Sequence, residues 1–318
     1  MAKSETISWR PCLSPGDTIG VIATSGPSNP EWFHKAIKAL ESFGYRAKVA
    51  LDPTRYYGST QCLFSSDTPK QRAEALTQLF MDPEVRCIVA SRGSYGAIEI
   101  LPHLDFERIR AAPKPFIGFS DTTVLLTTLA DRAQVPTVHG PNIEATFGKT
   151  AQSTDATFSV ESLLMLLSSG SLERLAALPR SILFGSGEMQ GRVTGGNLMS
   201  LVSLLGTPFS PAFDDRILFL EEVREKPYKV HRALMQLALA GKLEKLAGVL
   251  LGDFIDCVHE KGLGPTLEDV LKDIFAQRSY PVLRVSGLGH GARNCALPFG
   301  VPLRISANHL EFSRRAGL

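Results

Sequence analysis

Short apolar runs alternate with helical patterns through the first half of the chain. The runs Thr18–Ala23, Val85–Ala90 and Phe116–Phe119 are apolar almost throughout, which predicts buried strands. Apolar residues at helical spacing lie between these runs, and the third run leads directly into a helical pattern over Thr122–Asp131. Strands and helices that alternate in this way predict a mostly parallel sheet with helices on both faces.

The pattern changes in the second half of the chain. Residues 169–187 are rich in Ser, Gly, Leu and Pro without a clear period, and we interpret them as an inter-domain linker. After the linker the pattern predicts, in order, a glycine-led helix over Gly195–Leu205, a strand over Arg216–Leu220, a helix over Tyr228–Ala240, a strand over Ala247–Gly252, a helix over Leu267–Phe275 and a strand over Val282–Val285. We therefore expect an α/β domain over residues 1–168 and a smaller, mixed domain over residues 188–318.

Composition narrows the class of protein. The chain has 318 residues, with 34 Lys plus Arg against 32 Asp plus Glu, and this near balance argues against a nucleic-acid-binding surface spread over the whole protein. Five scattered cysteines without a CxxC pair suggest neither a disulfide framework nor a thiolate zinc site. The start of the chain is polar, and no apolar run approaches the roughly 20 residues of a membrane helix. These features predict a cytoplasmic protein without a membrane partner.

The sharpest chemical signal is PFIGFSDTTVLL at residues 115–126. A short apolar strand ends in Gly118-Phe119-Ser120, and a helix begins at once. A serine on such a strand-to-helix turn presents its hydroxyl at the edge of the sheet, close to the first helical N–H groups, as in serine hydrolases. The match to GxSxG is partial because Thr122 replaces the second glycine. The alternative is that Ser120 only caps the helix, as serine often does.

A nucleophilic serine needs a histidine as its base and an acid that orients the histidine. His290 lies between glycines just after a predicted strand, and His139 in VPTVHGPN is the second candidate. The acid is expected where the run RILFLEE ends, at Glu221 or Glu222. Two solvated glutamates at a strand end are the alternative there.

Other segments carry weaker signals for binding chemistry. The small residues of ASRGSYGA (90–97) follow a strand, and their backbone N–H groups are candidates for half of an oxyanion hole, the alternative being a plain glycine turn. The segment TSGPSN (24–29) lacks the glycine spacing of nucleotide-binding loops. Cys257-Val258-His259 alone is weak evidence for a metal, so neither a metal nor an organic cofactor is predicted.

Taken together, these segments resemble the L,D-carboxypeptidase family, which contains the muramoyltetrapeptide carboxypeptidases of murein recycling and the microcin C immunity proteins. The similar motifs run in order along nearly the whole chain: GDTIGVIATSGP, ASRGSYGA, IGFSD, HGPN, TGGNLMSLVSLLGTP, ILFLEE, KVHRALMQL and GLGHGARNCALPFG. The resemblance implies a flavodoxin-like parallel-sheet N-terminal domain followed by a smaller, β-rich mixed C-terminal domain. It also implies a homodimer.

The resemblance implies a Ser-Glu-His triad in that chain order. Carried over by motif, the nucleophile is Ser120 of GFSD, the orienting acid is Glu221 as the first glutamate of LEE, and the base is His290 of GHGAR. On this reading the first domain carries the nucleophile, and the second carries the acid and the base.

The resemblance also implies oxyanion donors from the backbone. One is the N–H group of Asp121, and the other belongs to Gly93 or Ser94. This chain has RGSYG where the family usually has RGGYG, and serine disfavours the positive φ that glycine adopts freely, so the second donor stays open. Arg92 and Arg293 are the candidates for binding the substrate carboxylate.

The implied activity is hydrolysis of the L,D-peptide bond before the C-terminal D-alanine of murein tetrapeptides. One alternative is a hydrolase of the microcin C immunity type, which cleaves acyl-sulfamate or peptidyl-nucleotide analogues. RGSYGA is more similar to the murein branch. The other alternative is a non-catalytic α/β module that binds a sugar or a nucleotide, with Ser120 as a helix cap.

Overall fold

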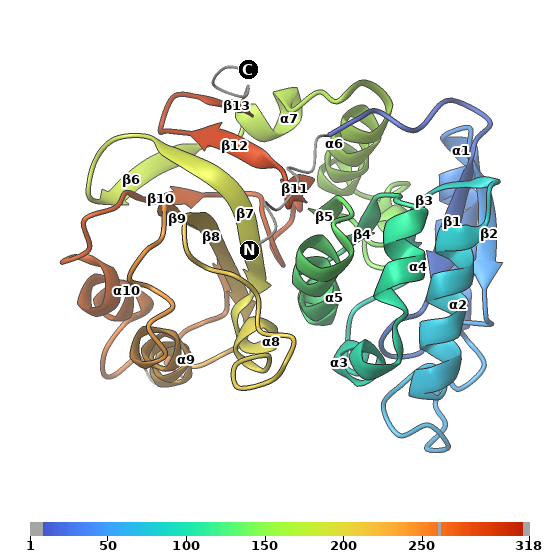
Figure 1. Ribbon diagram of the computed structural model, residues 1–318, viewed down its shortest axis with the longest axis horizontal. Helices are drawn as coiled ribbons and strands as arrows, with labels where there is room; N and C mark the ends of the chain where they lie inside the picture. The colour runs from blue at the N-terminus through green and yellow to red at the C-terminus, as the bar shows by residue number, and fades with distance from the viewer. Residues whose placement is uncertain (1–8, 260–261, 314–318) are drawn as a thin grey trace.

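Two β-sheets lie side by side in the computed structural model, which describes residues 9–259 and 262–313 (Figure 1). The first sheet has the strand order β11-β5-β4-β3-β1-β2, and the second has the order β13-β12-β7-β8-β9-β10-β6. The predicted mixed α/β fold with a parallel first sheet is confirmed.

The first sheet has five parallel strands and one antiparallel strand at its edge. The parallel strands are β1 (Thr18–Ile22), β2 (Arg46–Ala50), β3 (Val85–Ala90), β4 (Phe116–Gly118) and β5 (Thr137–His139). Their order, β2-β1-β3-β4-β5, is that of flavodoxin-like sheets, in which functional groups gather at the carboxyl ends of the strands. The antiparallel edge strand, β11 (Leu297–Phe299), comes from near the end of the chain.

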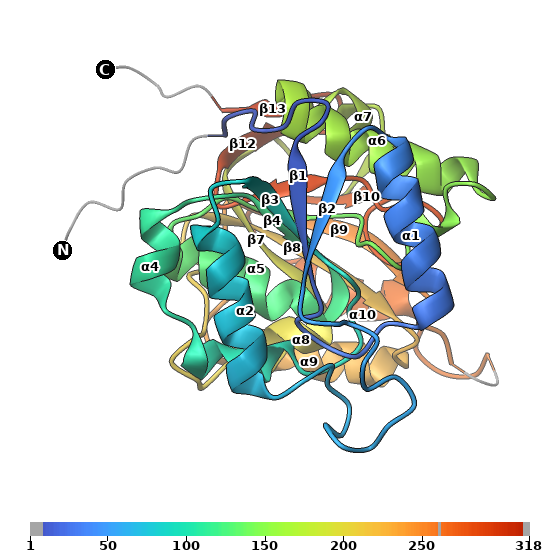
Figure 2. The ribbon, with the colours of Figure 1, turned by 90° about the vertical axis from the view of Figure 1, so that its right-hand side faces the viewer.

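Helices cover both faces of the first sheet, which explains why every residue of β1 is buried. Figure 2 shows α1 and α6 on one side of the sheet and α2 and α4 on the other. The helices of this half are α1 (Pro30–Ser42), α2 (Pro69–Met81), α3 (Ala97–Ile100), α4 (Phe106–Ala111), α5 (Thr123–Thr128), α6 (Thr154–Ser169) and α7 (Glu173–Ala176). Short turns of tighter or wider helix complete it: η1 (Leu101–His103), η2 (Ser120–Thr122), η3 (Leu129–Ala133) and η4 (Phe147–Lys149).

The second sheet is parallel at its centre and antiparallel at its edges. Its strands are β6 (Arg180–Phe184), β7 (Met189–Asn197), β8 (Arg216–Val223), β9 (Gly248–Ile255), β10 (Val282–Val285), β12 (Pro302–Ile305) and β13 (Leu310–Phe312). Three helices pack on one of its faces: α8 (Leu198–Val202), α9 (Pro227–Leu239) and α10 (Leu267–Phe275). Successive residues of β8 point to opposite faces, so Leu220 joins the core under these helices and Phe219 joins the larger core shared with the first sheet.

Two predictions from the second half differ from the structure. The segment 169–187 is more than a connection, because it contains α7 and also β6, which pairs with β10. Edge strand β6 is only partly buried, and it therefore lacks the continuous apolar run that marks a central strand. The glycine-led helix begins later than expected, since Gly195 and Gly196 still belong to β7 and α8 starts at Leu198.

The two halves of the chain are held together by strand pairing and core packing as well as by the chain itself. Strand β11 completes the first sheet although it follows the second half, and one apolar core extends across both halves. Close packing at the junction requires glycine, because a Cβ at Gly196 would lie 2.5 Å from Thr123 Oγ1. The same hydroxyl accepts a hydrogen bond from the backbone N–H of Asn197 at 3.0 Å.

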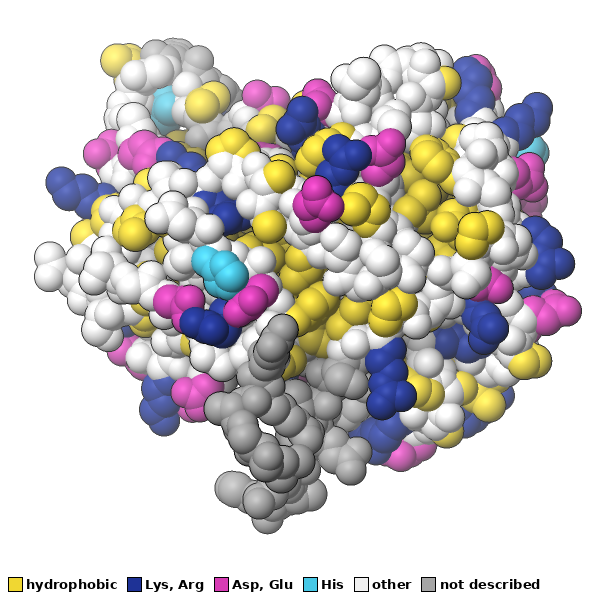
Figure 3. Space-filling model, turned by 90° about the horizontal axis from the view of Figure 1, so that it is seen from above, with side chains coloured by type: hydrophobic (Ala, Val, Ile, Leu, Met, Phe, Trp, Pro, Cys, Tyr) yellow, Lys and Arg dark blue, Asp and Glu magenta, His cyan; other side chains and the backbone are white. Residues whose placement is uncertain are grey.

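None of the helices within 9–259 and 262–313 is long and apolar enough to cross a lipid bilayer. Figure 3 shows one face of the molecule, on which basic and acidic side chains lie close together instead of in separate regions. This mixed distribution agrees with the near balance of charge in the sequence.

Candidate active site

Ser120 lies on a strained turn between β4 and α5. Its φ is +63°, a left-handed conformation that costs a non-glycine residue free energy and that nucleophilic serines adopt on such turns. Phe119 before it is fully extended, and the turn η2 has no side-chain cap. The helix-cap alternative for Ser120 is therefore wrong, because its hydroxyl contacts a histidine from the other half of the chain instead.

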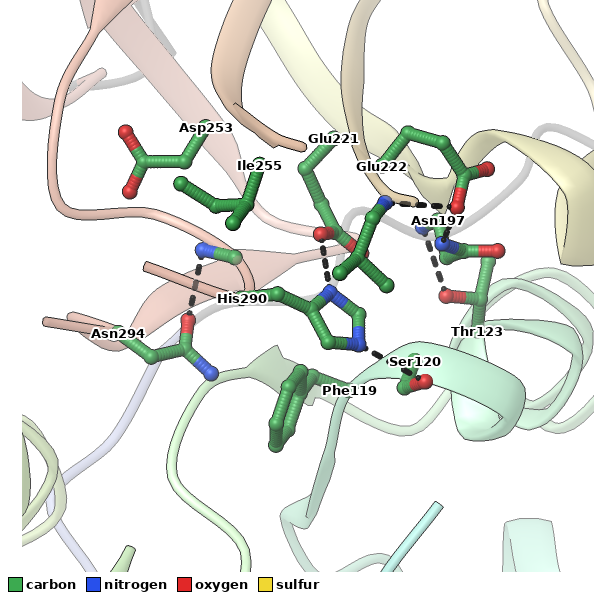
Figure 4. Close-up of polar contacts among 12 residues, drawn as sticks. Phe119, Ser120, Thr123, Asn197, Glu221, Glu222, Asp253, Ile255, His290 and Asn294 are labelled. Carbon is green, nitrogen blue, oxygen red and sulfur yellow. Dashed lines mark hydrogen bonds and ion pairs between the residues drawn. The ribbon is translucent and has the colours of Figure 1, made fainter. Parts of the chain in front are cut away.

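Ser120, His290 and Glu221 form one hydrogen-bonded line across the two halves (Figure 4). His290 Nε2 lies 3.1 Å from Ser120 Oγ, and His290 Nδ1 lies 2.6 Å from Glu221 Oε2. A carboxylate only accepts hydrogen bonds, so Nδ1–H donates to Glu221 and Nε2 is left to accept the serine proton. This is the geometry that general-base activation of a hydroxyl requires.

Opposing effects act on the pKa of His290. Burial of the ring lowers the pKa, whereas the hydrogen bond to Glu221 and the charge of this carboxylate raise it, with a further contribution from Glu222. The net result is a pKa above the ordinary value of histidine. The site therefore stabilises the imidazolium that forms when His290 takes a proton.

The two adjacent glutamates of β8 have different partners. Both are buried within the strand, so the alternative of a solvated strand end is wrong. Glu222 accepts hydrogen bonds from Asn197 Nδ2 at 2.8 Å and from the backbone N–H of Met199 at 3.0 Å, so it fixes the start of α8. Glu221 points the other way, to the face of Phe219, and reaches His290.

The loop after β10 brings His290 to Glu221. Gly289 has φ +116°, and a Cβ at this position would lie 2.6 Å from Glu221 Oε2, so only glycine permits the approach. The backbone N–H of Gly289 donates to Asn294 Oδ1 at 3.0 Å. Asp253 of β9 accepts from the backbone N–H of Gly287 at 3.1 Å, which holds the start of the loop.

His139, the second histidine candidate, also lies at the site. It ends β5, is fully buried, and its Nε2 is 4.0 Å from Glu221 Oε1. Burial lowers its pKa to about 3, so the ring is neutral. Neither ring nitrogen of His139 has a hydrogen-bond partner, and it is His290 that contacts the hydroxyl of Ser120.

The glycine turn after β3 packs directly against Ser120. A Cβ at Gly93 would lie 2.9 Å from the Cβ of Ser120, so a larger residue would displace the serine. Ser94 adopts φ +89°, so the chain places a serine in the conformation that was expected to disfavour it. The carbonyl of Gly93 accepts a hydrogen bond from the N–H of Gly26 at 3.3 Å. In a trans peptide the N–H of Ser94 therefore points away from Gly26.

Side chains that sequence reasoning missed hold this turn in place. The carboxylate of Asp121 accepts a hydrogen bond from the backbone N–H of Ala97 at 2.8 Å. Arg72 of α2 is fully buried and donates to the carbonyl of Gly96 at 2.9 Å. The available signal was an arginine in the same helical stripe as Leu76 and Phe80, where a solvated cation is out of place.

The two arginines predicted to bind a carboxylate already have acidic partners. Arg92 lies 3.5 Å from Glu144 and also donates to the carbonyl of Pro27 at 3.1 Å. Arg293 donates to Asp155 at 2.7 Å and packs over the ring of Phe158. Either one has to share its charge with these carboxylates if it binds a substrate.

A pocket of about 320 Å³ opens beside His290. Phe119 and the residues that flank His290 form one wall, and small or hydroxyl-bearing side chains such as Ala156 and Ser159 form another. Lys149, an exposed residue at the end of η4, also lines it. The pocket contains one cation and several hydroxyl groups, and most of its other side chains are small, so it suits a small polar group.

Nothing in the described part of the chain groups three or more His, Cys, Asp or Glu side chains into an arrangement that holds a metal ion. The weak sequence signal at Cys257 and His259 thus has no further ligands around it among those residues. The sulfur of Cys257 instead contacts the carbonyl of Ile255.

Comparison with known proteins places these features in a family. A model of the LD-carboxypeptidase N-terminal domain matches residues 19–140, and a model of the LD-carboxypeptidase C-terminal domain matches residues 190–305. The chain is 33% identical to a probable murein peptide carboxypeptidase of Bacillus subtilis, over 93% of this chain and 91% of that protein. It is 34% identical to a murein tetrapeptide carboxypeptidase of Pseudomonas aeruginosa, over 78% of this chain and 81% of that protein.

A solved structure has the same fold. The structure of MccF in complex with glutamyl sulfamoyl guanosine superposes with a TM-score of 0.83 and 25% sequence identity. The match covers 96% of this chain and 98% of that one. Since both family models and a full-length structure match, the resemblance extends over both halves of the chain.

Proposed function

The chain belongs to the LD-carboxypeptidase family of serine-type hydrolases, and we propose that it removes the C-terminal D-alanine from murein tetrapeptides. The observation that carries this proposal is the line from Ser120 through His290 to Glu221, which joins a strained serine to a buried carboxylate. The murein substrate is supported by the relatives at 33% and 34% identity. The reaction would serve peptidoglycan recycling in the cytoplasm.

In the proposed mechanism Ser120 attacks the carbonyl carbon of the L,D-peptide bond. His290 takes the serine proton on Nε2 and later gives it to the leaving amine, while Glu221 keeps the other ring proton on Nδ1. The resulting acyl-enzyme is hydrolysed by water through the same groups in reverse roles. The backbone N–H groups of Asp121 and of the glycine turn bind the oxyanion. For the turn, Ser94 is the better donor, because the carbonyl of the same peptide is engaged by Gly26.

The pocket beside His290 is proposed to receive the leaving D-alanine. A base that returns its proton to the leaving amine must lie next to that amine, so the leaving residue has to sit on the side of His290. The pocket is lined by His290 and Phe119, and its volume of about 320 Å³ accommodates a small amino acid.

The carboxylate of that residue needs a cation. Arg92 and Arg293 remain proposed partners, but each is paired with an acidic side chain, whereas Lys149 lines the pocket itself. We expect Lys149→Met to raise KM for the tetrapeptide about tenfold or more, because a charge-assisted hydrogen bond is lost, with little change in kcat. Lys38→Met on the exposed side of α1 is the matched control. An unchanged KM in the Lys149 variant would instead favour Arg92 or Arg293 as the residue that binds the substrate carboxylate.

The test of the proposed function is direct. The protein is incubated with murein tri-, tetra- and pentapeptides, and any released amino acid is identified by its chirality. Release of D-alanine from the tetrapeptide by the parent, and not by Ser120→Ala, is the expected result. Release of an L-amino acid, or of none from all three peptides, contradicts the proposal.

A second candidate substrate has support from one observation, the fold match to MccF bound to glutamyl sulfamoyl guanosine. On this reading the pocket would take a sulfamoyl nucleoside as leaving group. Parallel assays with glutamyl sulfamoyl guanosine and with the murein tetrapeptide compare the two by kcat/KM. A higher value for the nucleoside conjugate would favour the immunity-type activity.

The homodimer implied by the family resemblance is also a proposal. It is measured as the molar mass in solution by light scattering after gel filtration. A mass close to twice that of the chain is expected.

A further inference from the structure

Next to the hydrogen-bonded line of Ser120, His290 and Glu221, two buried polar groups face each other without a hydrogen-bond partner: Glu221 Oε1 and the ring of His139. Glu221 uses Oε2 for His290, but its Oε1 has no partner in the described structure, and neither ring nitrogen of His139 has one. The two side chains are fully buried, and His139 Nε2 lies 4.0 Å from Glu221 Oε1. Buried polar atoms in native proteins nearly always have a hydrogen-bond partner, so two unpaired groups that face each other need an explanation.

The surroundings of His139 leave it few other partners. Its ring packs against Phe219 at 4.8 Å, against Phe119 at 6.0 Å and against Phe299 at 6.2 Å, measured between ring centroids. These rings offer no acceptor for a ring N–H group, and the other polar groups that act on the ring are the backbone of His139 itself and the charge of His290. Glu221 Oε1 lies 4.0 Å from Nε2, and it is the carboxylate oxygen that His290 does not use.

We propose that His139 is a positioning residue that donates a hydrogen bond from Nε2–H to Glu221 Oε1 in the working enzyme. The proposal rests on the proposed triad, which it extends by one residue, to Ser120–His290–Glu221–His139. The gap of 4.0 Å is longer than a hydrogen bond, but catalytic hydrogen bonds are often long without substrate and shorten in the complex. Closing it to normal length needs a movement of about 1 Å.

Chemistry favours this direction of donation. Burial holds the pKa of His139 at about 3, so the ring is neutral and carries one proton. A neutral imidazole with the proton on Nε2 is a donor toward Glu221 without placing a second positive charge beside His290. With the proton on Nε2, Nδ1 is an acceptor without a hydrogen-bond partner, which costs less than a buried charge without one.

The role of this contact is to set the basicity of Glu221. A donor on Oε1 withdraws charge from the carboxylate, so Glu221 holds the Nδ1 proton of His290 less strongly and does not pull it across. The other ionisable groups that act on Glu221 are Glu222 of β8, Asp253 of β9 and Cys257 after β9, and they interact through charge rather than by a hydrogen bond. His139 comes from β5 in the first sheet, so the acid of the second sheet would be tuned by the first.

The tautomer of His139 tests the proposal in the unmodified enzyme. With ¹⁵N-histidine labelling, two-bond N–H couplings in NMR spectra show which ring nitrogen of each histidine carries the proton. We expect His139 to hold its proton on Nε2 across the pH range of activity. A proton on Nδ1, or a His139 that is doubly protonated near neutral pH, overturns the proposal, and no substrate is needed for this measurement.

Matched variants test the effect on His290. His139→Phe keeps an aromatic ring in the cluster but removes the donor, whereas His139→Gln keeps an N–H group near the position of Nε2. In His139→Phe the carboxylate becomes the stronger acceptor, so the pKa of His290 should rise by about one unit, as measured by NMR titration. The rate of Ser120 labelling by a fluorophosphonate should fall by up to about tenfold at neutral pH, because less of His290 is neutral. His139→Gln should restore both values toward those of the parent.

A purely structural role for His139 gives a different result. Both variants would then lower the midpoint of thermal unfolding, while the pKa of His290 stays at the parent value, and this outcome rejects the proposal. Equal behaviour of the Phe and Gln variants in the titration rejects it as well. The proposed substrate fails separately, through the absence of D-alanine release by the parent enzyme, so the two failures are distinguishable.

Discussion

The two halves of the molecule hold their proposed catalytic groups in different ways. In the first half, Ser120 is placed by its own backbone, on a turn of three residues with a positive φ and Gly93 packed against it. In the second half, His290 and Glu221 come from elements 69 residues apart and depend on tertiary contacts through Gly289 and Asn294. The serine is therefore positioned by its local backbone conformation, and the acid–base pair by a network of hydrogen bonds and close contacts.

This difference predicts different responses to substitution. Backbone strain is stored locally and is tolerated because the surrounding strand and helix are well packed, so a change of the serine side chain leaves the fold intact. A network of buried polar groups loses both orientation and stability when one member is removed.

Ser120→Ala should lower kcat for the tetrapeptide by about 10⁴- to 10⁶-fold, because the nucleophile is lost. Its free energy of unfolding should stay within about 0.5 kcal/mol of the parent, since the hydroxyl does not cap the helix. Ser120→Gly should be equally inactive and about 1 kcal/mol more stable than the alanine variant, because glycine relieves the left-handed strain. Rates and urea unfolding check both, and an alanine variant with activity within tenfold of the parent removes Ser120 from the mechanism.

The adjacent glutamates separate chemistry from structure within the network. Glu221→Gln should lower kcat about 10³- to 10⁴-fold, because the charge that stabilises the His290 imidazolium is lost. Glu222→Gln should change kcat less than about tenfold but lower the free energy of unfolding by about 1–3 kcal/mol, since it disturbs the bonds to Asn197 and Met199. Steady-state kinetics and denaturation of both variants decide, and a crippled Glu222→Gln beside a near-normal Glu221→Gln would reverse the assignment.

Gly289→Ala tests the close approach of the histidine loop to Glu221. The added Cβ would meet Glu221 Oε2 at 2.6 Å at a backbone φ of +116°, so we expect about a 100-fold loss of kcat and a stability loss of about 1–3 kcal/mol. Gly241→Ala is the control, because it also has a positive φ but open space around the new Cβ. If both variants lose the same activity, the steric contact has no special importance for the site.

The pH dependence of kcat/KM tests the pair His290 and Glu221 without involving the serine. Burial lowers the pKa of His290, but the hydrogen bond to Glu221 and its charge outweigh this effect, so the pKa lies above the ordinary 6.5. Because neutral His290 is the base in the proposed mechanism, the acid limb of kcat/KM should have its midpoint above pH 6.5. The corresponding stability is fully present below pH 6.5 and is lost as pH rises through the raised pKa.

Glu221→Gln provides the check on that sign. It removes the charge but keeps the burial, so the midpoint of the acid limb should move to lower pH. The pH profile of the residual activity measures this shift. A midpoint that stays fixed would mean that the limb belongs to another group.

Much of the scaffold follows from periodicity, because buried elements have strong patterns. The predicted ranges Leu267–Phe275 and Val282–Val285 coincide with α10 and β10, where one face of the helix and most of the strand are apolar and buried. Strand β6 was missed because its residues are only partly buried. The start of α8 was misplaced because Gly195 and Gly196 extend β7 toward α5 instead of starting a helix.

Within the site, motif order suggested the three residues that the structure brings together, but their partners depend on contacts between the halves. Asn294 and Asp253 hold the histidine loop through backbone N–H groups, and a sequence pattern does not record such bonds. His139 was recognised as a candidate base, yet its neighbour is the glutamate, because β5 and β8 meet only in three dimensions. The conformation of Ser94 was likewise outside what residue preference predicts.

Strand β11 has a consequence for the folding of the protein. Residues Leu297–Phe299 form the antiparallel edge of the first sheet beside β5, and the segment just before them is bonded to α6 through Ser159 and Ser162. Without these residues the edge strand β5 has no antiparallel partner. The first sheet and the hydrogen-bonded line from Ser120 through His290 to Glu221 therefore depend on one short stretch, residues 290–299, so a chain cut before this stretch would lose the edge strand and His290 together.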